Sequence, residues 1–279
     1  MTLRSSSSLL LIDAGNTRVK AGVCAWPEID AAELPEFMAC IAVPCGTAMP
    51  WDELNRCAAD RGRMVAAIAG SNPPEVDRIV REWPAGWPAP RVINDRRTFP
   101  LTIDVDFPDK VGIDRLLGAI AANVVRKEGQ PAVIISSGTA TTVDYVDERG
   151  HFCGGAILPG FELCAKALNE YTALLPLIEM DAVLAVGESP VEIGRNTHAA
   201  ITSGLYWGHV GAVKELLHRL TVTRSGDRSQ REGDGPRHAP LVLLTGGAAP
   251  LLKPHLPENV QLEPHLALQG LALVLAESE

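Results

Sequence analysis

Three short turns, each containing glycine and a hydroxyl residue, follow apolar stretches of the sequence: Asp13–Thr17 (DAGNT), Ser136–Thr139 (SSGT) and Thr245–Gly247 (TGG). Because glycine lacks a Cβ atom, the backbone N–H groups of such a turn can approach an anion closely, and neighbouring hydroxyl groups can donate further hydrogen bonds. A single hairpin turn of this type is usually structural. Three of them in this order predict a site that holds a polyphosphate.

Asp13 ends the apolar stretch Leu9–Ile12, where a strand would otherwise be wholly buried. A turn-forming aspartate is the ordinary explanation. In a polyphosphate site the carboxylate would instead hold Mg²⁺ through water, because Mg²⁺ keeps much of its hydration shell. Lys20, at the end of the same motif, is either a phosphate ligand or a lysine on the outer face of a strand. The residues alone leave both pairs of alternatives open.

Asp114, in the motif GIDR, is a second carboxylate that could do chemistry. Phosphoryl transfer to a hydroxyl needs in-line positioning, charge neutralisation and a base for the hydroxyl proton. The residues alone favour a simpler role, in which Asp114 caps a helix and Arg115 pairs with it. The GxxxxGK[ST], HExxH, GxSxG and GxGxxG signatures are all missing, so the common nucleotide, metalloprotease and hydrolase sites are not indicated.

The elements that must position these residues follow from hydrophobic periodicity. Leu9–Ile12 and Arg18–Val23 are predicted to form two strands around the first turn, and Ala132–Ile135 and Thr142–Val146 two strands around the second. A dinucleotide-binding fold would place a helix directly after the glycine turn. Gly15 and Gly138 occupy matching places in these hairpins, so the sequence predicts a duplicated domain.

Further elements are predicted between and after the hairpins. Strands are expected within 151–160 and at Leu241–Leu244, the latter followed by a helix; helices are expected at 73–83, at 112–125 and from 196 to about 220. The last of these helices is rich in alanine and glycine, which permits close packing. The polar segment Thr223–Pro240 is predicted to be an exposed or disordered loop.

Composition narrows the class of protein. The chain has 279 residues, enough for two domains, and 46% of them are hydrophobic. Its net charge of −9 disfavours a dominant nucleic-acid-binding surface. There is no apolar run long enough to span a membrane and none that fits a signal peptide. The six cysteines are scattered without a CxxC motif, so we expect reduced thiols in a cytoplasmic protein.

The turns resemble the two phosphate motifs and the adenosine motif of the superfamily of acetate and sugar kinases, heat-shock chaperones and actin. Within it, a collinear set of motifs from about Leu9 onwards resembles type III pantothenate kinase: LIDAGNTRVKAGV, GIDRLLGAIAA, SGTATTVDYV, GGAILPGFELCAKAL, IGRNTHAAITSG and LLTGGAAPLL. The resemblance implies an α/β fold of duplicated actin-like (ribonuclease H-like) domains, with mixed β-sheets flanked by helices and an ATP cleft between them. We place these domains at 1–118 and 119–279.

The resemblance also implies an activity, which is phosphorylation of pantothenate by ATP at the first step of coenzyme A synthesis. The resemblance implies that Asp114 is the catalytic base rather than a helix cap. The implied ATP-binding residues, with Mg²⁺ on Asp13, are Asp13, Ala14, Gly15, Asn16, Thr17, Arg18, Val19, Lys20, Gly138, Thr139, Gly246 and Gly247. The implied substrate-binding residues are Gly112, Ile113, Asp114, Arg115 and Thr197. Thr197 could alternatively be a helix N-cap, and the two roles can coexist.

Two positions depart from the family pattern. Ser136 stands where many members have an aspartate that binds a monovalent cation, and a hydroxyl is a weaker ligand than a carboxylate. A requirement for K⁺ or NH₄⁺ is therefore either reduced or must rest on carbonyl oxygens. Val105 stands where many members have a substrate-contacting tyrosine, a role that Phe107 could take. The alanine- and glycine-rich helix and the GGAILPG segment would suit a homodimer, although ordinary packing within the domain explains them equally well.

Two alternatives remain open at this point. One is a kinase for another small hydroxy acid or sugar, which a substrate screen would separate. The other is an actin-like ATP-binding regulatory or accessory protein, which would bind ATP without transferring phosphate to an acceptor.

Overall fold

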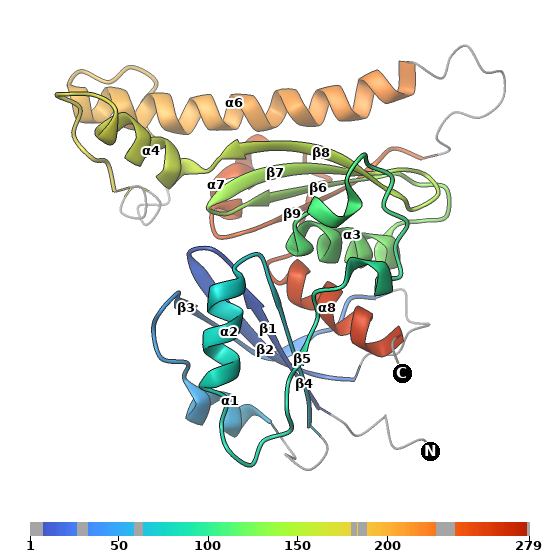
Figure 1. Cartoon of the computed structure of the whole chain (residues 1–279). Helices are drawn as coiled ribbons and strands as arrows, with labels where there is room; N and C mark the ends of the chain where they lie inside the picture. Colours follow the sequence, from blue (N-terminus) through green and yellow to red (C-terminus); the bar gives the residue numbers. More distant parts are fainter. Residues whose placement is uncertain are drawn as a thin grey trace. The chain divides into compact units, whose positions relative to one another are not determined.

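The computed structural model of the chain describes residues 8–26, 33–58, 64–179, 183, 189–226 and 238–277. They form two compact units (Figure 1). Unit 1 comprises Met1–Arg126 together with His265–Glu279, and unit 2 comprises Lys127–Pro264. The boundary expected after residue 118 would cut a helix that stays whole in unit 1, and the last helix of the chain also belongs to unit 1.

Unit 1 is built on a five-stranded mixed sheet in the order β3-β2-β1-β4-β5. Its strands are β1 (Ser8–Ala14), β2 (Arg18–Ala25), β3 (Phe37–Pro44), β4 (Met64–Gly70) and β5 (Arg91–Val92). Its α-helices are α1 (Trp51–Cys57), α2 (Pro73–Arg81), α3 (Ile113–Val125) and α8 (Leu266–Glu277), and its 3₁₀-helices are η3 (Arg96–Thr98) and η4 (Pro108–Lys110). β1 runs antiparallel to β2 and parallel to β4.

Unit 2 repeats this plan in a sheet with the order β10-β9-β6-β7-β8. Its strands are β6 (Ala132–Ser137), β7 (Ala140–Val146), β8 (Phe152–Pro159), β9 (Leu241–Thr245) and β10 (Gln261–Leu262), and its helices are α4 (Phe161–Glu170), α6 (Thr197–Gly226), α7 (Ala249–Leu252) and η5 (Lys253–His255). β6 runs antiparallel to β7 and parallel to β9, as β1 does to β2 and β4. The shared strand order confirms the predicted duplication.

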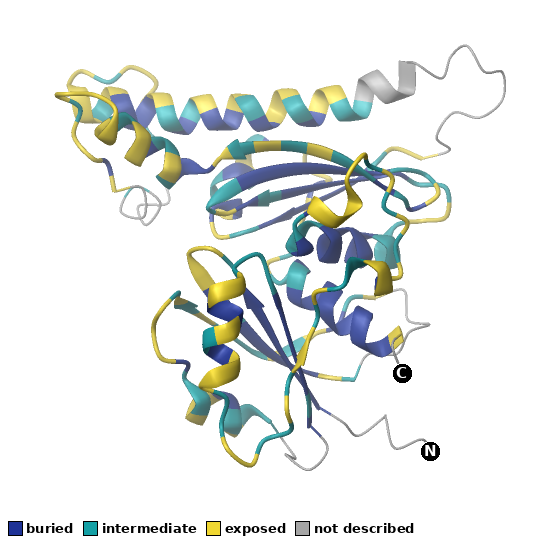
Figure 2. Cartoon of the chain, in the orientation of Figure 1, coloured by how far each residue is buried: buried dark blue, intermediate teal, exposed yellow. Residues whose placement is uncertain are grey.

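The centre of each sheet is apolar on both faces, as strands covered by helices require. Every residue of β1 is buried, and so are all five residues of β9 (Figure 2). In unit 1, α3 and α8 pack against each other. Gly270 of α8 lies so close to α3 that a Cβ atom there would stand 2.1 Å from the backbone oxygen of Leu117. This contact is why α8 joins unit 1 rather than the unit that precedes it in sequence.

Each element predicted from the sequence is present, but one helix extends further than predicted. Helix α6 continues to Gly226, so Thr223–Gly226 is helical rather than part of the predicted polar loop; residues 227–237 of that loop lie outside the described residues. The strands and α-helices above that were not predicted are β3, β4, β5, β10, α1, α4 and α8. Within the described part of the chain, no helix has both the length and the apolar character needed to cross a membrane.

Candidate active site

The first glycine turn connects β1 to β2 as a tight hairpin, as predicted. The Gly15 N–H donates to the Arg18 carbonyl oxygen at 3.1 Å, and a Cβ atom on Gly15 would stand 2.9 Å from that same oxygen. The side chains of Asn16, Thr17 and Arg18 are exposed, while Ala14 and Val19 on the flanking strands are buried. The turn therefore presents backbone and polar side chains to solvent from a rigid apolar base.

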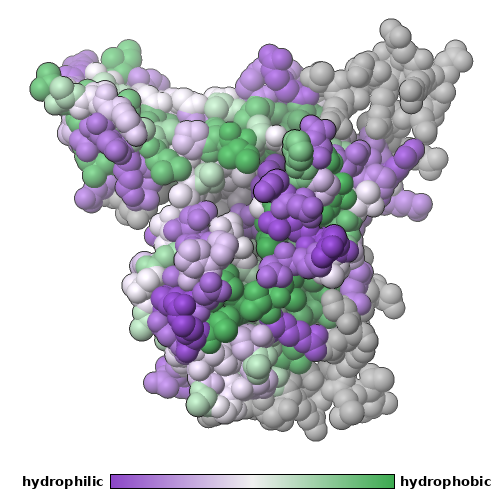
Figure 3. All heavy atoms as spheres, in the orientation of Figure 1, coloured by the Kyte–Doolittle hydropathy of each residue, from purple (hydrophilic) through white to green (hydrophobic). Residues whose placement is uncertain are grey.

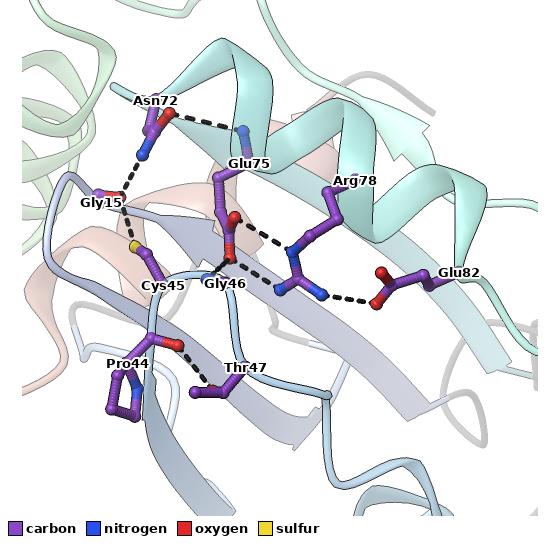
Figure 4. Close-up of polar contacts among 9 residues, drawn as sticks. All are labelled: Gly15, Pro44, Cys45, Gly46, Thr47, Asn72, Glu75, Arg78 and Glu82. Carbon is purple, nitrogen blue, oxygen red and sulfur yellow. Dashed lines mark hydrogen bonds and ion pairs between the residues drawn. The ribbon is translucent and has the colours of Figure 1, made fainter.

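Two side chains hold the back of this turn by its carbonyl group (Figure 4). The Gly15 oxygen accepts hydrogen bonds from Asn72 Nδ2 at 3.3 Å and from Cys45 Sγ at 3.2 Å. Asn72 is also the N-cap of α2, where its side chain accepts from the Glu75 N–H at 3.4 Å. The turn is thus anchored to the start of a helix and to the loop after β3.

Glu75 supports the same region from α2. Its buried carboxylate accepts from the Gly46 N–H at 3.0 Å and from Arg78 Nη2 at 2.7 Å (Figure 4). The hydrogen bonds from Arg78, the largest cause, hold the pKa of Glu75 below its ordinary value. A charged Glu75 therefore fixes the loop that carries Cys45.

Asp13 combines burial with an unsatisfied oxygen. The residue is 8% exposed, and among the described residues Asp13 Oδ1 has no hydrogen-bond partner. Burial, followed by repulsion from the Asp114 carboxylate, raises the pKa of Asp13 to about 6, while Lys20 opposes the rise. An orphaned buried carboxylate oxygen fits a magnesium ligand, directly or through water. The described residues contain no cluster of three or more His, Cys, Asp and Glu that could hold a metal by itself.

Lys20 lies across from Asp13 in the β1–β2 ladder. Residues paired in this way extend from the same face of a sheet, where opposite charges attract. Lys20 is half-buried and acts electrostatically on both Asp13 and His265. Its partial burial beside Asp13 is the feature on which its proposed role as a phosphate ligand rests.

Asp114 occupies the first turn of α3, where a negative charge is favoured by the helix dipole. The N-cap of this helix is Gly112, so Asp114 is not the capping residue. A Cβ atom on Gly112 would stand 2.7 Å from Asp114 Oδ1, so the glycine leaves room for the carboxylate. Arg96 Nε donates to the Val111 oxygen at 2.6 Å and fixes the approach to the helix. Ile113 is buried, and Asp114 and Arg115 are half-buried.

In unit 2 the second and third glycine turns lie side by side. The Gly138 N–H donates to the Ala140 oxygen at 3.1 Å, which closes a hairpin one residue shorter than that in unit 1. The Ser137 oxygen accepts from the Ala248 N–H at 3.0 Å. Gly246 has φ +97°, and a Cβ atom there would stand 2.3 Å from the Ser137 oxygen. Only glycine fits this meeting point of the two turns.

The duplication exposes a counterpart of the third turn that the sequence reading missed. It is Gly70–Asn72, which begins at the last residue of β4, and its counterpart Gly246–Ala248 directly follows β9. The Asn72 N–H donates to the Ala14 oxygen at 3.2 Å, and a Cβ atom on Gly70 would stand 2.2 Å from that oxygen. The stretch MVAAIAGSN has the same strand-into-glycine pattern as LVLLTGG and could have revealed it.

Ser136 stands in unit 2 at the place that Asp13 has in unit 1. Its neighbours across the sheet are Thr142 on β7 and Thr245 on β9, whereas those of Asp13 are Lys20 and Ala69. A row of three hydroxyl residues thus replaces the charged pair. Thr142 Oγ1 donates to the buried Asp144 carboxylate at 2.9 Å.

Thr197 begins α6, but Asn196 caps the helix. Asn196 Oδ1 accepts from the Ala199 N–H at 2.8 Å, and the Asn196 carbonyl accepts from the Ala200 N–H at 2.9 Å. Because Asn196 makes these hydrogen bonds, the hydroxyl of the exposed Thr197 is not needed as the cap. Phe107 is 72% exposed beside η4, and Val105 is half-buried.

Comparison with known proteins identifies the family. The sequence profile described as type III pantothenate kinase matches residues 9–219. The chain belongs to the type III pantothenate kinase family. A relative of that name from Gluconobacter oxydans is 34% identical over 278 residues, which cover 95% of this chain and 92% of the relative. Another from Thermomicrobium roseum is 30% identical over 272 residues, which cover 94% of this chain and 95% of the relative.

Two solved structures are similar in fold. Component A of (R)-2-hydroxyglutaryl-CoA dehydratase from Acidaminococcus fermentans has a TM-score of 0.50 at 14% identity, covering 98% of this chain and 99% of its own. A putative 2-dehydro-3-deoxygalactonokinase from Sinorhizobium meliloti has a TM-score of 0.50 at 14% identity, covering 96% and 97%. At this identity they bear on the fold alone. With the repeated strand order of the two sheets, they confirm the predicted duplicated, actin-like α/β fold.

Proposed function

We propose that the protein transfers the γ-phosphoryl group of ATP to the primary hydroxyl of pantothenate and so starts coenzyme A synthesis. Membership of the type III pantothenate kinase family supports this substrate pair. The structural observation that supports it most is that the Asp13 and Asp114 carboxylates act on each other: Asp13 lies near the end of β1, directly before the first glycine turn, and Asp114 lies in the first turn of α3. Two nearby carboxylates with different surroundings suit one metal-holding and one proton-accepting role.

Asp114 is the base in this proposal. Its carboxylate accepts the proton of the pantothenate hydroxyl as the hydroxyl oxygen bonds to the γ-phosphorus, and ADP leaves with the electrons of the broken P–O bond. Gly112, Ile113 and Arg115 line the acceptor side, with Arg115 facing the pantothenate carboxylate. Thr197 is proposed as a further substrate contact, because Asn196 already caps α6.

The glycine turns of both units bind the nucleotide in this proposal. Gly15–Arg18 and Gly138–Thr139 contact the phosphates through backbone N–H groups, and Gly246 and Gly247 contact the adenosine. Lys20, on the same face as Asp13, is proposed to reach a phosphate. Mg²⁺ on Asp13 would neutralise phosphate charge when bound.

Formation of phosphopantothenate from ATP and pantothenate, with Mg²⁺ and either K⁺ or NH₄⁺ present, tests the activity. We expect turnover that depends on pantothenate and is absent with other hydroxy acids and sugars at equal concentration. ATP binding without transfer to any acceptor would overturn the proposal and favour an ATP-binding regulatory protein.

For the monovalent cation we propose a weak requirement. The place equivalent to Asp13 in unit 2 carries Ser136 between two threonines, and neutral oxygens hold a cation less strongly than a carboxylate. Turnover in Na⁺ should therefore stay within a few-fold of that in K⁺ or NH₄⁺. Ser136→Asp should increase the dependence on K⁺, and an absolute K⁺ requirement of the unaltered protein would contradict the proposal.

We further propose that the protein is a homodimer that pairs through unit 2. Figure 3 shows hydrophobic side chains at the surface of the end of this unit that carries α4. The exposed apolar residues of this unit include Ile157, Leu163, Tyr171, Leu174, Leu177, Val191 and Ile193. Large exposed apolar side chains suit an interface between copies. Light scattering should give a dimer for the unaltered protein and for Val92→Glu in unit 1, and a monomer for Leu174→Glu.

A further inference from the structure

A buried chain of hydrogen bonds in unit 2 runs from helix α6 to Ser137, which ends β6 and directly precedes Gly138 of the second glycine turn. His209 Nε2 is 3.0 Å from Thr141 Oγ1, and Thr141 Oγ1 is 3.2 Å from Ser137 Oγ. Ser137 and Thr141 are 0% exposed, and His209 is 6% exposed. A polar chain this deeply buried is costly unless every member is paired, so each hydroxyl is held in place by the next.

His209 is also linked to the second glycine turn through Phe161 and Gly160. Its ring lies against Phe161, with the ring centroids 4.2 Å apart. Phe161 directly follows Gly160, whose N–H donates to the Thr139 oxygen at 3.0 Å, and a Cβ atom on Gly160 would stand 2.2 Å from the Gly138 oxygen. Two segments next to the second glycine turn are thus linked to the His209 ring: the end of β6 through Ser137, and the start of α4 through Phe161.

Ser137 joins this chain to the third turn as well. Its carbonyl oxygen accepts from the Ala248 N–H and leaves no room for a side chain at Gly246. We propose that His209 is a positioning residue for the nucleotide: through Thr141 and Ser137 it fixes the relative placement of the two glycine turns of unit 2 that bind ATP. This inference rests on the proposed role of these turns in ATP binding.

The chemistry of His209 suits a fixed support rather than proton transfer to substrate. Burial lowers the pKa of His209, so the ring is neutral near pH 7. A neutral ring can either accept from or donate to the Thr141 hydroxyl. The motif analysis did not single out this residue, because its partners come from distant parts of the sequence.

Three variants separate positioning from simple packing. His209→Phe keeps a ring against Phe161 but removes the hydrogen bond, and we expect KM for ATP to rise about tenfold while KM for pantothenate stays within twofold. His209→Gln keeps an amide group near the position of Nε2 and should restore most of the ATP affinity. His218→Phe, at an exposed histidine of the same helix, is the matched control and should leave both constants unchanged.

A double-mutant cycle tests the route through Thr141. Thr141→Val should weaken ATP binding, and adding His209→Phe to it should have little further effect. Calorimetry with ATP alone measures this affinity independently of turnover, so an inactive unaltered protein would defeat the proposed function without affecting the inference. Unchanged ATP affinity in His209→Phe, or additive effects of the two substitutions, would overturn the inference.

Discussion

Asp13 and Asp114 act on each other, although one ends a strand and the other begins a helix. Each is held near the other by apolar neighbours, since β1 is buried along its length and Ile113 lies in the core. The result is a buried carboxylate that resists ionisation beside a half-buried one. The proposed roles, metal at Asp13 and proton at Asp114, follow the family resemblance, and the Oδ1 of Asp13, unpartnered among the described residues, supports the first of them.

Asp114→Asn should lower turnover about 10²- to 10⁴-fold, the usual contribution of a general base. The amide keeps the shape of the side chain at Gly112 but cannot accept the hydroxyl proton. ATP affinity, measured by calorimetry, should change little. Asp109→Asn, at an exposed carboxylate of η4, is the matched control. Full activity in Asp114→Asn would show that another group is the base.

Asp13→Asn should stabilise the Mg²⁺-free protein above about pH 6. The pKa of Asp13 is about 6 in the folded protein and near its ordinary value of 3.8 in the unfolded chain. The protonated Asp13 side chain therefore contributes its full stabilisation below about pH 4, and this stabilisation is lost as the pH rises through 6. Urea unfolding should show the variant gaining up to about 3 kcal/mol over the unaltered protein between pH 4 and pH 7. An equal difference at both pH values would contradict the shifted pKa.

At the scale of elements, each sheet places two turns against each other at the end of parallel neighbours. β1 and β4 bring Ala14 to Gly70, and β6 and β9 bring Ser137 to Gly246. The backbone contacts at these points depend on glycine, because a side chain would meet a carbonyl oxygen. The strand order, rather than the local sequence, creates this requirement.

Gly246→Ala should therefore destabilise the protein and weaken ATP binding, since Gly246 has a positive φ and a backbone oxygen 2.3 Å from the added Cβ. We expect a loss of about 2–4 kcal/mol in the free energy of unfolding. Gly247→Ala is the matched control for the unfolding measurement alone, because an added Cβ there has nothing within 4 Å. Similar unfolding curves for the two variants would show that the contact between the turns is not rigid.

At the scale of the whole molecule, unit 1 is completed by residues from the other end of the chain. Helix α8 is buried at nearly every position, and it packs on β1, β2 and β4 as well as on α3. A domain boundary drawn once along the sequence cannot describe this arrangement. Helix α8 therefore contributes core residues to unit 1 from the far end of the chain.

Gly270→Ala should disrupt the packing of α8 on α3, because the added Cβ would lie 2.1 Å from the Leu117 oxygen on α3. We expect a loss of more than about 2 kcal/mol, measured by urea unfolding. Gly211→Ala, at an exposed helical glycine of α6 with open space around it, should be neutral or slightly stabilising. Equal stability of the two variants would show that α3 and α8 can separate without cost.

The sequence alone determined the family, through a collinear set of motifs, and predicted the candidate site: three glycine turns after apolar strands, with Asp13 and Asp114 at their places. These signals are local, so periodicity and residue type were enough to find them. Only the tertiary structure showed the turn at Gly70, the placement of α8 in unit 1, and the chain from His209 to Ser137. Each depends on contacts between residues far apart in the sequence, and such contacts are set by strand order and packing rather than by neighbouring residues.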